Sequence, residues 1–158
     1  MSDSTNENEP TDAADRLGVV VVDHGSRRDD SNQALERFVE RFAERSGFDI
    51  VEPAHMELAE PSIETAVGRC VARGATRVVV CPFFLLPGKH WTGDLPRLTE
   101  AAARRHPGVQ AMVSAPIGGH DLLIMLLRDR VKHCLARQDH PESGCDVCRG
   151  EGGCHWLG

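Results

Sequence analysis

The stretch LGVVVVDHGSR, residues 17–27, decides the fold. Its first part, Leu17–Val22, is a short apolar run rich in β-branched residues, which is typical of a strand buried on both faces. His24 and Gly25 follow one residue later, and a glycine lets the backbone turn sharply behind the imidazole. The run therefore predicts a buried strand with His24 projecting from its carboxyl end, although a histidine that merely caps the strand fits this segment equally well.

Strand-like and helix-like segments alternate along the rest of the chain. Apolar spacing predicts further strands over 50–56, 78–81 and 109–114, and helices over 30–45, 61–73, 95–105 and 121–137. This alternation predicts an α/β fold, a four-stranded parallel sheet with helices on both faces. Ligands of such sheets bind outside the carboxyl ends of the strands. Site residues are therefore expected just after Val22, Ala54 and Cys81.

Composition and charge exclude several classes of protein. The 158 residues suit one domain, and 41% hydrophobic with 27% charged residues indicates a globular chain. Residues 1–15 contain five acidic and no basic residues and predict a disordered acidic tail, followed by a folded domain over 16–137 and a Cys/Gly-rich tail over 138–158. The balance of charge predicts no nucleic-acid surface, and the apolar runs are too short for a membrane span. Without a secretory or transit signal, a cytoplasmic location is expected.

Candidate ligands follow three of the predicted strands. His24 follows the first, Glu57 follows the second, and His90 ends the segment PFFLLPGKHW, residues 82–91, after the third. Two imidazoles and one carboxylate suit a first-row divalent metal ion that must be released again. The apolar loop over 83–86 suggests a wall for a flat apolar ligand, although it could instead continue the strand into the core.

These motifs resemble a known family. DHGSR (23–27), MELAEPSIETAV (56–67), CPFFLLPGKH (81–90) and PIG (116–118) are similar to those of the small class II tetrapyrrole chelatases of the CbiX and SirB type. The resemblance extends over about residues 17–135. It implies a single chelatase lobe that inserts Fe²⁺, or alternatively Co²⁺, into sirohydrochlorin without ATP, on the way to sirohaem or cobalamin. One lobe cannot enclose a macrocycle, so a homodimer is expected.

The resemblance also implies roles for individual residues. It identifies His24, Glu57 and His90 as the catalytic and metal-binding residues. The apolar loop would bear on one face of the macrocycle and cations would bind its carboxylates, which gives the expected substrate-binding residues Ser26, Arg27, Phe84, Leu85 and Lys89. Asp23 departs from the family, which commonly has glycine there. Its carboxylate is expected to interact electrostatically with the imidazole of the neighbouring His24.

The six cysteines fall into two groups. Cys70 and Cys81 lie in a predicted helix and strand and are expected to be core residues. The second group is expected to bind metal rather than form disulfides, because a C-x2-C pair with a further cysteine six residues on indicates ligation; it comprises Cys134, Cys145, Cys148 and Cys154. Thiolates suit zinc and iron–sulfur clusters alike. Similarity to plant-like sirohydrochlorin ferrochelatases with a C-terminal cysteine motif favours a [2Fe-2S] cluster over Zn²⁺, and His155 could replace Cys134 as a ligand.

Two other functions fit the same residues. The domain could be a carrier that holds a metal or a tetrapyrrole without reacting, or the cysteine tail could make it a redox sensor. Turnover would separate an enzyme from a carrier.

Overall fold

The structure, a computed structural model, describes residues 15–139 and contains every predicted strand and helix, with ends shifted by no more than two residues. A π-helical turn, η1, was not predicted. In chain order the elements are β1 (Leu17–Asp23), α1 (Asp29–Ser46), β2 (Ile50–His55), α2 (Ile63–Ala72), β3 (Arg77–Pro82), η1 (His90–Asp94), α3 (Leu95–Ala103), β4 (Gln110–Val113) and α4 (Asp121–Asp139).

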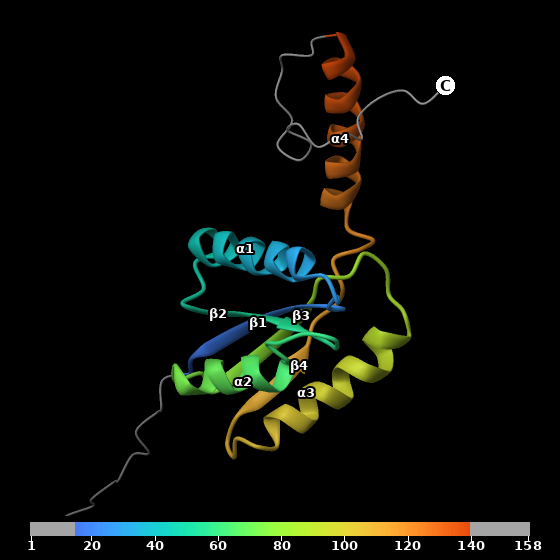
Figure 1. Cartoon of the computed structure of the whole chain (residues 1–158). Helices are drawn as coiled ribbons and strands as arrows, with labels where there is room; N and C mark the ends of the chain where they lie inside the picture. The colour runs from blue at the N-terminus through green and yellow to red at the C-terminus, as the bar shows by residue number, and fades with distance from the viewer. Residues whose placement is uncertain (1–14, 140–158) are drawn as a thin grey trace, which may run out of the picture. The chain divides into compact units, whose positions relative to one another are not determined.

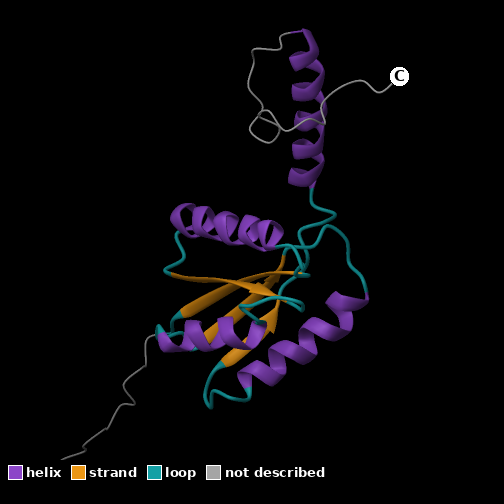
Figure 2. Ribbon diagram, viewed as in Figure 1, coloured by secondary structure: helices purple, strands orange, loops and turns teal. Residues whose placement is uncertain are grey.

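The strands form one parallel sheet in the order β2-β1-β3-β4 (Figures 1 and 2), which confirms the predicted fold class. β1 lies inside the sheet, where Val20 pairs with Glu52 of β2 on one side and with Val80 of β3 on the other. Its four consecutive valines, 19–22, are at most 5% exposed. The apolar run is therefore continuous, because both faces of this strand are covered.

Helices pack on both faces of the sheet, with α1 on one side and α2 and α3 on the other (Figure 1). The α1 side buries Val19 and Val21 against Leu35 and Val39. The α2 and α3 side buries the alternate strand residues against helix residues such as Val67, Leu95 and Ala102. Alternation along β1 thus divides its valines between two hydrophobic clusters.

Two cysteines confirm the expectation that they are core residues. Cys70 of α2 is fully buried, and this burial raises the pKa of its thiol to about 12. Cys81 of β3 is half-buried and packs against the cluster on the α1 side, and burial also raises the pKa of its thiol. Both thiols therefore stay protonated and unreactive near neutral pH.

The outer edge of β2 is covered by groups of the chain itself. The Arg73 guanidinium donates to the carbonyl oxygens of Asp49 and Val51. Pro53, in the middle of the strand, has no N–H to offer, and the His55 N–H donates to the Pro61 carbonyl (2.7 Å). These features close most of an edge that would otherwise present unpaired backbone groups.

The chain divides into two compact units, residues 1–116 and 117–158, and α4 belongs to the second. The acidic segment 1–14 and the cysteine-rich segment 140–158 lie outside the described residues, so the tails expected there stay predictions. Within residues 15–139, no helix is long and apolar enough to cross a membrane.

Candidate functional site

His24 and Glu57 are brought together by backbone pairing that continues past the ends of β1 and β2. The Met56 N–H donates to the Asp23 carbonyl (2.9 Å), and the Glu57 N–H donates to the His24 carbonyl (3.1 Å). The two side chains meet as well, with His24 Nε2 3.1 Å from Glu57 Oε1. The structure thus joins two of the predicted site residues, which are 33 positions apart in the sequence.

Gly25 makes this approach possible. Its φ is +87°, in the left-handed region, and a Cβ built at this position would lie 1.9 Å from the Glu57 carbonyl oxygen. Only glycine fits such a close backbone contact. Further along, the Ser26 N–H donates to Asn32 Oδ1 and the Asn32 amide donates back to the Ser26 carbonyl, both at 2.9 Å. The start of α1 therefore holds the loop that carries His24.

His90 reaches the same place from the loop after β3. It is the first residue of η1, and the next residue, Trp91, donates from its indole nitrogen to the Ser114 carbonyl (2.9 Å) after β4. The His90 ring lies edge-on to the His24 ring, with centroids 5.1 Å apart and planes at 76°. All three predicted ligand residues therefore lie together at the carboxyl ends of β1, β2 and β3.

Asp94 belongs to this site and was not identified from the sequence. Its Oδ2 lies 2.8 Å from His90 Nδ1, and η1 places the two side chains four residues apart on one face. The hydrogen bond with His90 is the main reason why the pKa of the Asp94 carboxyl lies below its ordinary value, with smaller contributions from His90 charge, Arg97 and Lys89. Because an ionised carboxylate only accepts hydrogen bonds, the proton sits on Nδ1 and Nε2 is the free ligand atom.

The three ligand candidates are all open to solvent, with side chains that are 46% (His24), 53% (Glu57) and 49% (His90) exposed. Glu57 already occupies the Nε2 atom through which His24 would bind an ion. Within the described part of the chain, no three His, Cys, Asp or Glu side chains are arranged as a ready metal-ligand set. Metal binding by these residues therefore stays a prediction, and an ion would have to enter between His24 and Glu57.

Asp23 pairs with His55 rather than with His24, its neighbour in the sequence. Its Oδ1 lies 2.6 Å from Nδ1 of His55 and also accepts the Gly25 N–H (3.0 Å). The reason is register, because Asp23 and His55 are directly paired residues of β1 and β2 and share a face of the sheet. His55 itself is fully buried.

The apolar loop after β3 has two parts. Phe84 is half-buried and packs against the core, while the Phe83 ring lies 4.6 Å from that of Phe38. Leu85 and Leu86 are 60% and 76% exposed. Both alternatives considered for this loop are thus partly right, since Phe84 extends the core, while Phe83 (38% exposed) and the two leucines offer an apolar surface.

The other predicted substrate-binding residues surround the three ligand candidates. Ser26 Oγ accepts the Arg28 N–H (3.0 Å), so this hydroxyl holds the loop. Arg27 and Lys89 are exposed, one in the loop that follows His24 and one immediately before His90. The two cations are therefore open to a charged ligand, and the Ser26 hydroxyl keeps its hydrogen to donate.

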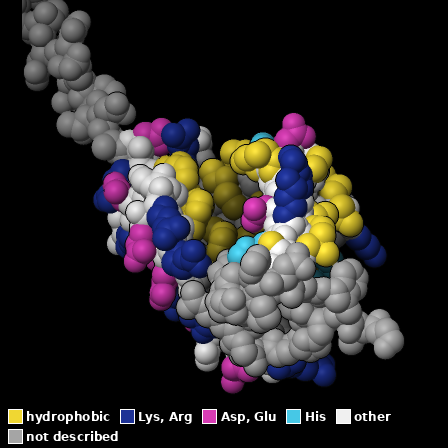
Figure 3. All heavy atoms as spheres, turned by 90° about the horizontal axis from the view of Figure 1, so that it is seen from above, with side chains coloured by type: hydrophobic (Ala, Val, Ile, Leu, Met, Phe, Trp, Pro, Cys, Tyr) yellow, Lys and Arg dark blue, Asp and Glu magenta, His cyan; other side chains and the backbone are white. Residues whose placement is uncertain are grey.

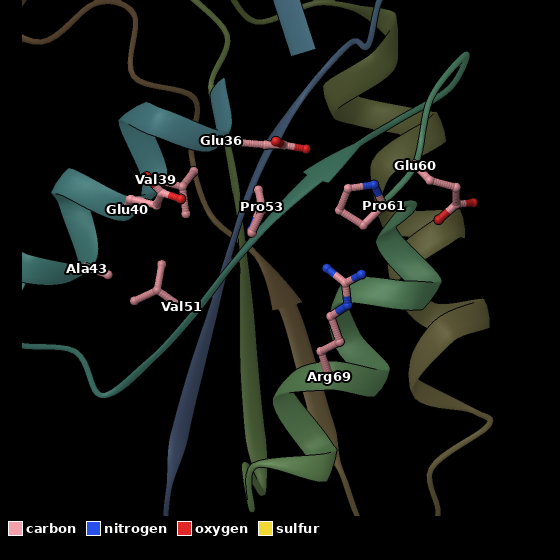
Figure 4. Close-up of a pocket in the computed structure, with 9 residues that line it drawn as sticks. All are labelled: Glu36, Val39, Glu40, Ala43, Val51, Pro53, Glu60, Pro61 and Arg69. Carbon is pink, nitrogen blue, oxygen red and sulfur yellow. The ribbon is translucent and has the colours of Figure 1, made fainter. Parts of the chain in front are cut away.

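Two cavities formed by the described residues lie beside this site. One of about 550 Å³ lies between α1 and β2, and Glu36, Glu40, Glu60 and Arg69 supply its charged lining (Figure 4). Another of about 360 Å³ shares Glu36 and Glu60 and extends to Ser26 and Arg27. Neither of these two is lined by His24, Glu57 or His90, whose side chains are about half exposed to solvent. From above, hydrophobic side chains lie exposed among charged ones (Figure 3).

The predicted cluster ligands are mostly outside the described residues. Cys145, Cys148 and Cys154 lie there, whereas Cys134 is a half-buried residue of α4.

Comparison with known proteins gives one family and several close relatives. The family model described as CbiX matches residues 18–134. The chain is 51% identical over 140 residues to the chloroplastic sirohydrochlorin ferrochelatase of Arabidopsis thaliana, which covers 89% of this chain. It is 45% identical over 80 residues, 51% of this chain, to the sirohydrochlorin cobaltochelatase of Methanocaldococcus jannaschii. The chain spans only 62% and 56% of these two relatives.

A solved structure agrees with the fold. The crystal structure of a CbiX protein from Marinobacter aquaeolei VT8 is 32% identical and superposes with a TM-score of 0.67, covering 77% of this chain and 98% of that one. The part of this chain that superposes therefore corresponds to nearly the whole of that solved chain.

The His90 hydrogen bond predicts how Asp94 titrates. Because the folded pKa lies below that of a free aspartate, about 3.9, the pair is intact above that pH and is lost as the pH falls through the lowered pKa. In His90→Ala the Asp94 titration midpoint, followed by the NMR shift of its carboxyl carbon, should rise. Arg97→Ala is the control and should raise it less, and an unchanged midpoint in His90→Ala would show that the hydrogen bond is not the cause.

Proposed function

The chain belongs to the CbiX family, and from this membership we propose that it inserts a divalent metal ion into sirohydrochlorin without ATP, in the biosynthesis of sirohaem or cobalamin. The observation that carries the proposal is the meeting of His24, Glu57 and His90 at one edge of the sheet. The names of the two relatives, a ferrochelatase and a cobaltochelatase of sirohydrochlorin, support the substrate.

The reaction needs a loosely held ion and a base. Sirohydrochlorin loses two pyrrole N–H protons as its four nitrogens bind the incoming M²⁺, so the products are the metallated macrocycle and two protons. His24 and Glu57 are 3.1 Å apart and can accept these protons, and an imidazole does so readily near neutral pH. His90, with its proton held on Nδ1 by Asp94, offers Nε2 to the ion.

The surroundings suit a flat molecule that carries carboxylates. Leu85 and Leu86 present an exposed apolar surface a few residues before His90, and Phe84 supports it from the core. Arg27 and Lys89 lie next to the ligand candidates in the sequence and would pair with substrate carboxylates.

We favour Fe²⁺ as the physiological ion, with Co²⁺ as the alternative. Imidazole and carboxylate ligands accept both ions. The longer and closer match is to the ferrochelatase, while the cobaltochelatase keeps the alternative open.

Single substitutions in the site test this function. His24→Ala, His90→Ala and Glu57→Gln should each lower the rate of metal insertion by about 100-fold or more, because each removes a ligand or a base. The rate is followed by the absorption change of sirohydrochlorin under anaerobic conditions with Fe²⁺ or Co²⁺. His106→Ala, a histidine beyond the end of α3, is the matched control.

The outcome separates three interpretations. Wild-type rates in the site variants would contradict the proposal, and loss of the far-UV spectrum in them would indicate a structural role instead. A single stoichiometric spectral change without turnover in the wild-type protein would favour the non-catalytic carrier.

We further propose a homodimer, on the basis of α4. Its residues Leu122–Leu127 are six consecutive apolar side chains, and five of them are at least 49% exposed: Leu122, Ile124, Met125, Leu126 and Leu127. Six consecutive positions point in every direction around a helix, and a helix that is apolar all round is normally buried on all sides. We propose that the α4 helix of a second copy of the chain packs against this apolar segment.

Sedimentation equilibrium tests the dimer. The full chain should sediment with the mass of two copies, and Ile124→Asp should shift it toward one copy because a buried carboxylate is costly. Phe48→Asp, at an exposed apolar residue between α1 and β2, is the control and should remain dimeric. A monomeric wild-type chain would contradict the proposal.

We propose that Cys134, Cys145, Cys148 and Cys154 hold a [2Fe-2S] cluster, with Zn²⁺ as the alternative. The support is the donor chemistry, since the C-x2-C spacing and a third nearby cysteine supply thiolates to either group. A cluster would supply one-electron redox chemistry and make the redox-sensor role testable.

Reduced thiols also require a reducing compartment, for which we propose the cytoplasm. The Arabidopsis relative is named chloroplastic, so imaging of a tagged chain decides between the two locations.

Removal of tail cysteines tests the cluster. Protein purified without oxygen should contain iron and absorb visible light, and Cys145→Ser with Cys148→Ser should lose both. Cys81→Ala, at a half-buried core cysteine, should keep both. Stoichiometric zinc without iron would establish the alternative, and absence of both metals would contradict ligation. Unchanged insertion activity and oxygen response in the double variant would exclude the sensor role.

A further inference from the structure

A third imidazole–carboxylate pair lies next to the site and takes no direct part in the proposed chemistry. His55, the last residue of β2, is fully buried, whereas the Asp23 side chain is 26% exposed. Nδ1 of His55 lies 2.6 Å from Oδ1 of Asp23. Nε2 of His55 has no hydrogen-bond partner among the described residues. A buried polar atom without a partner costs stability, and a fold keeps such an arrangement where it serves another purpose.

The pair occupies the last position of the β1–β2 ladder, where Asp23 and His55 are paired residues. The next two backbone hydrogen bonds, from Met56 to Asp23 and from Glu57 to His24, lie directly beyond it. His24 is the residue after Asp23, and Glu57 is two residues after His55. A change in the distance between Asp23 and His55 would therefore move His24 and Glu57, which are only one and two residues away along the backbone.

Gly25 links the pair to Glu57 by a second route. Its N–H donates to the same Asp23 oxygen that His55 approaches (3.0 Å). A Cβ on Gly25 would lie 1.9 Å from the Glu57 carbonyl oxygen and 3.2 Å from the His55 Cβ, so its backbone touches both residues. One carboxylate oxygen thus binds the turn after β1 and the end of β2 simultaneously.

We propose that Asp23 and His55 form a positioning pair that holds His24 and Glu57 in contact, so that both face the same metal ion. His55 is fully buried and cannot touch the substrate, and the Oδ1 atom of Asp23 is engaged by His55 and Gly25. This inference deepens the proposed function and rests on it for its activity readout. The pair needs a side-chain oxygen that accepts hydrogen bonds at position 23 and a side-chain N–H that donates one at position 55.

Three variants in the full chain separate positioning from simple stability. Asp23→Ala removes the acceptor and should lower kcat by about 10- to 100-fold, the usual effect of losing a group that orients a ligand, while KM for sirohydrochlorin stays unchanged. Asp23→Asn keeps an acceptor oxygen and should retain most of the activity. His55→Leu removes the donor but fills the buried space, and Asp23 keeps the Gly25 N–H and partial access to water. In this variant kcat should therefore fall while Tm falls no more than in the stability control described next.

Ala66→Gly is the matched control, because Ala66 is fully buried inside α2. Glycine in a helix interior lowers stability, so this variant should lower Tm and leave kcat unchanged. Wild-type kcat in His55→Leu, equal losses in Asp23→Asn and Asp23→Ala, or an equal kcat loss in Ala66→Gly would each overturn the inference. If Asp23→Ala does not fold, His55→Leu and Asp23→Asn still decide it.

An NMR measurement keeps this inference separate from the proposed function. In protein labelled with ¹⁵N-histidine, the ring resonances of His24 should shift in His55→Leu and stay in place in Ala66→Gly. Unshifted His24 resonances in His55→Leu would refute positioning whatever the activity. If the wild-type protein inserts no metal but these resonances shift, the proposed function fails and the positioning pair stands.

Discussion

The site depends on the register in which β1 pairs with β2. Asp23 opposite His55 is the last pair, and it places His24 and Glu57 within contact distance just beyond it. A slip of one residue would turn side chains to the opposite face and separate the two. Gly18 opposes the slip, because the slip would bring a side chain to its position, where a Cβ would lie only 2.9 Å from the Cβ of the buried Cys70. The packing of the core thereby fixes the position at which His24 and Glu57 meet.

Carboxylates orient imidazoles throughout this edge of the sheet. Glu57 contacts His24, Asp94 holds His90, and Asp23 holds the buried His55. The first of these pairs is about half exposed to solvent, whereas the imidazole of the last is fully buried. Under the proposed function, the buried pair supports groups that would accept a proton or bind a metal ion.

Much of this could be predicted from the sequence. The valine run and the amphipathic spacing of residues 30–45 predicted β1 and α1 because burial alone decides them. The rule that ligands bind beyond parallel strands brought His24, Glu57 and His90 into one hypothesis. What failed depends on tertiary geometry. The partner of Asp23 follows from strand register, the role of Asp94 follows from a π-helical turn, and the burial of Phe84 beside an exposed Leu85 follows from where the core ends.

The covered edge of β2 has a consequence for many copies of the chain kept at high concentration. Arg73 occupies the carbonyls of Asp49 and Val51, and Pro53 interrupts the row of donors. A strand screened in this way is a poor template for an incoming strand. Fibre growth from this side is therefore discouraged by a single guanidinium and a single imino acid, without any contribution from the chemistry at the far end of the sheet.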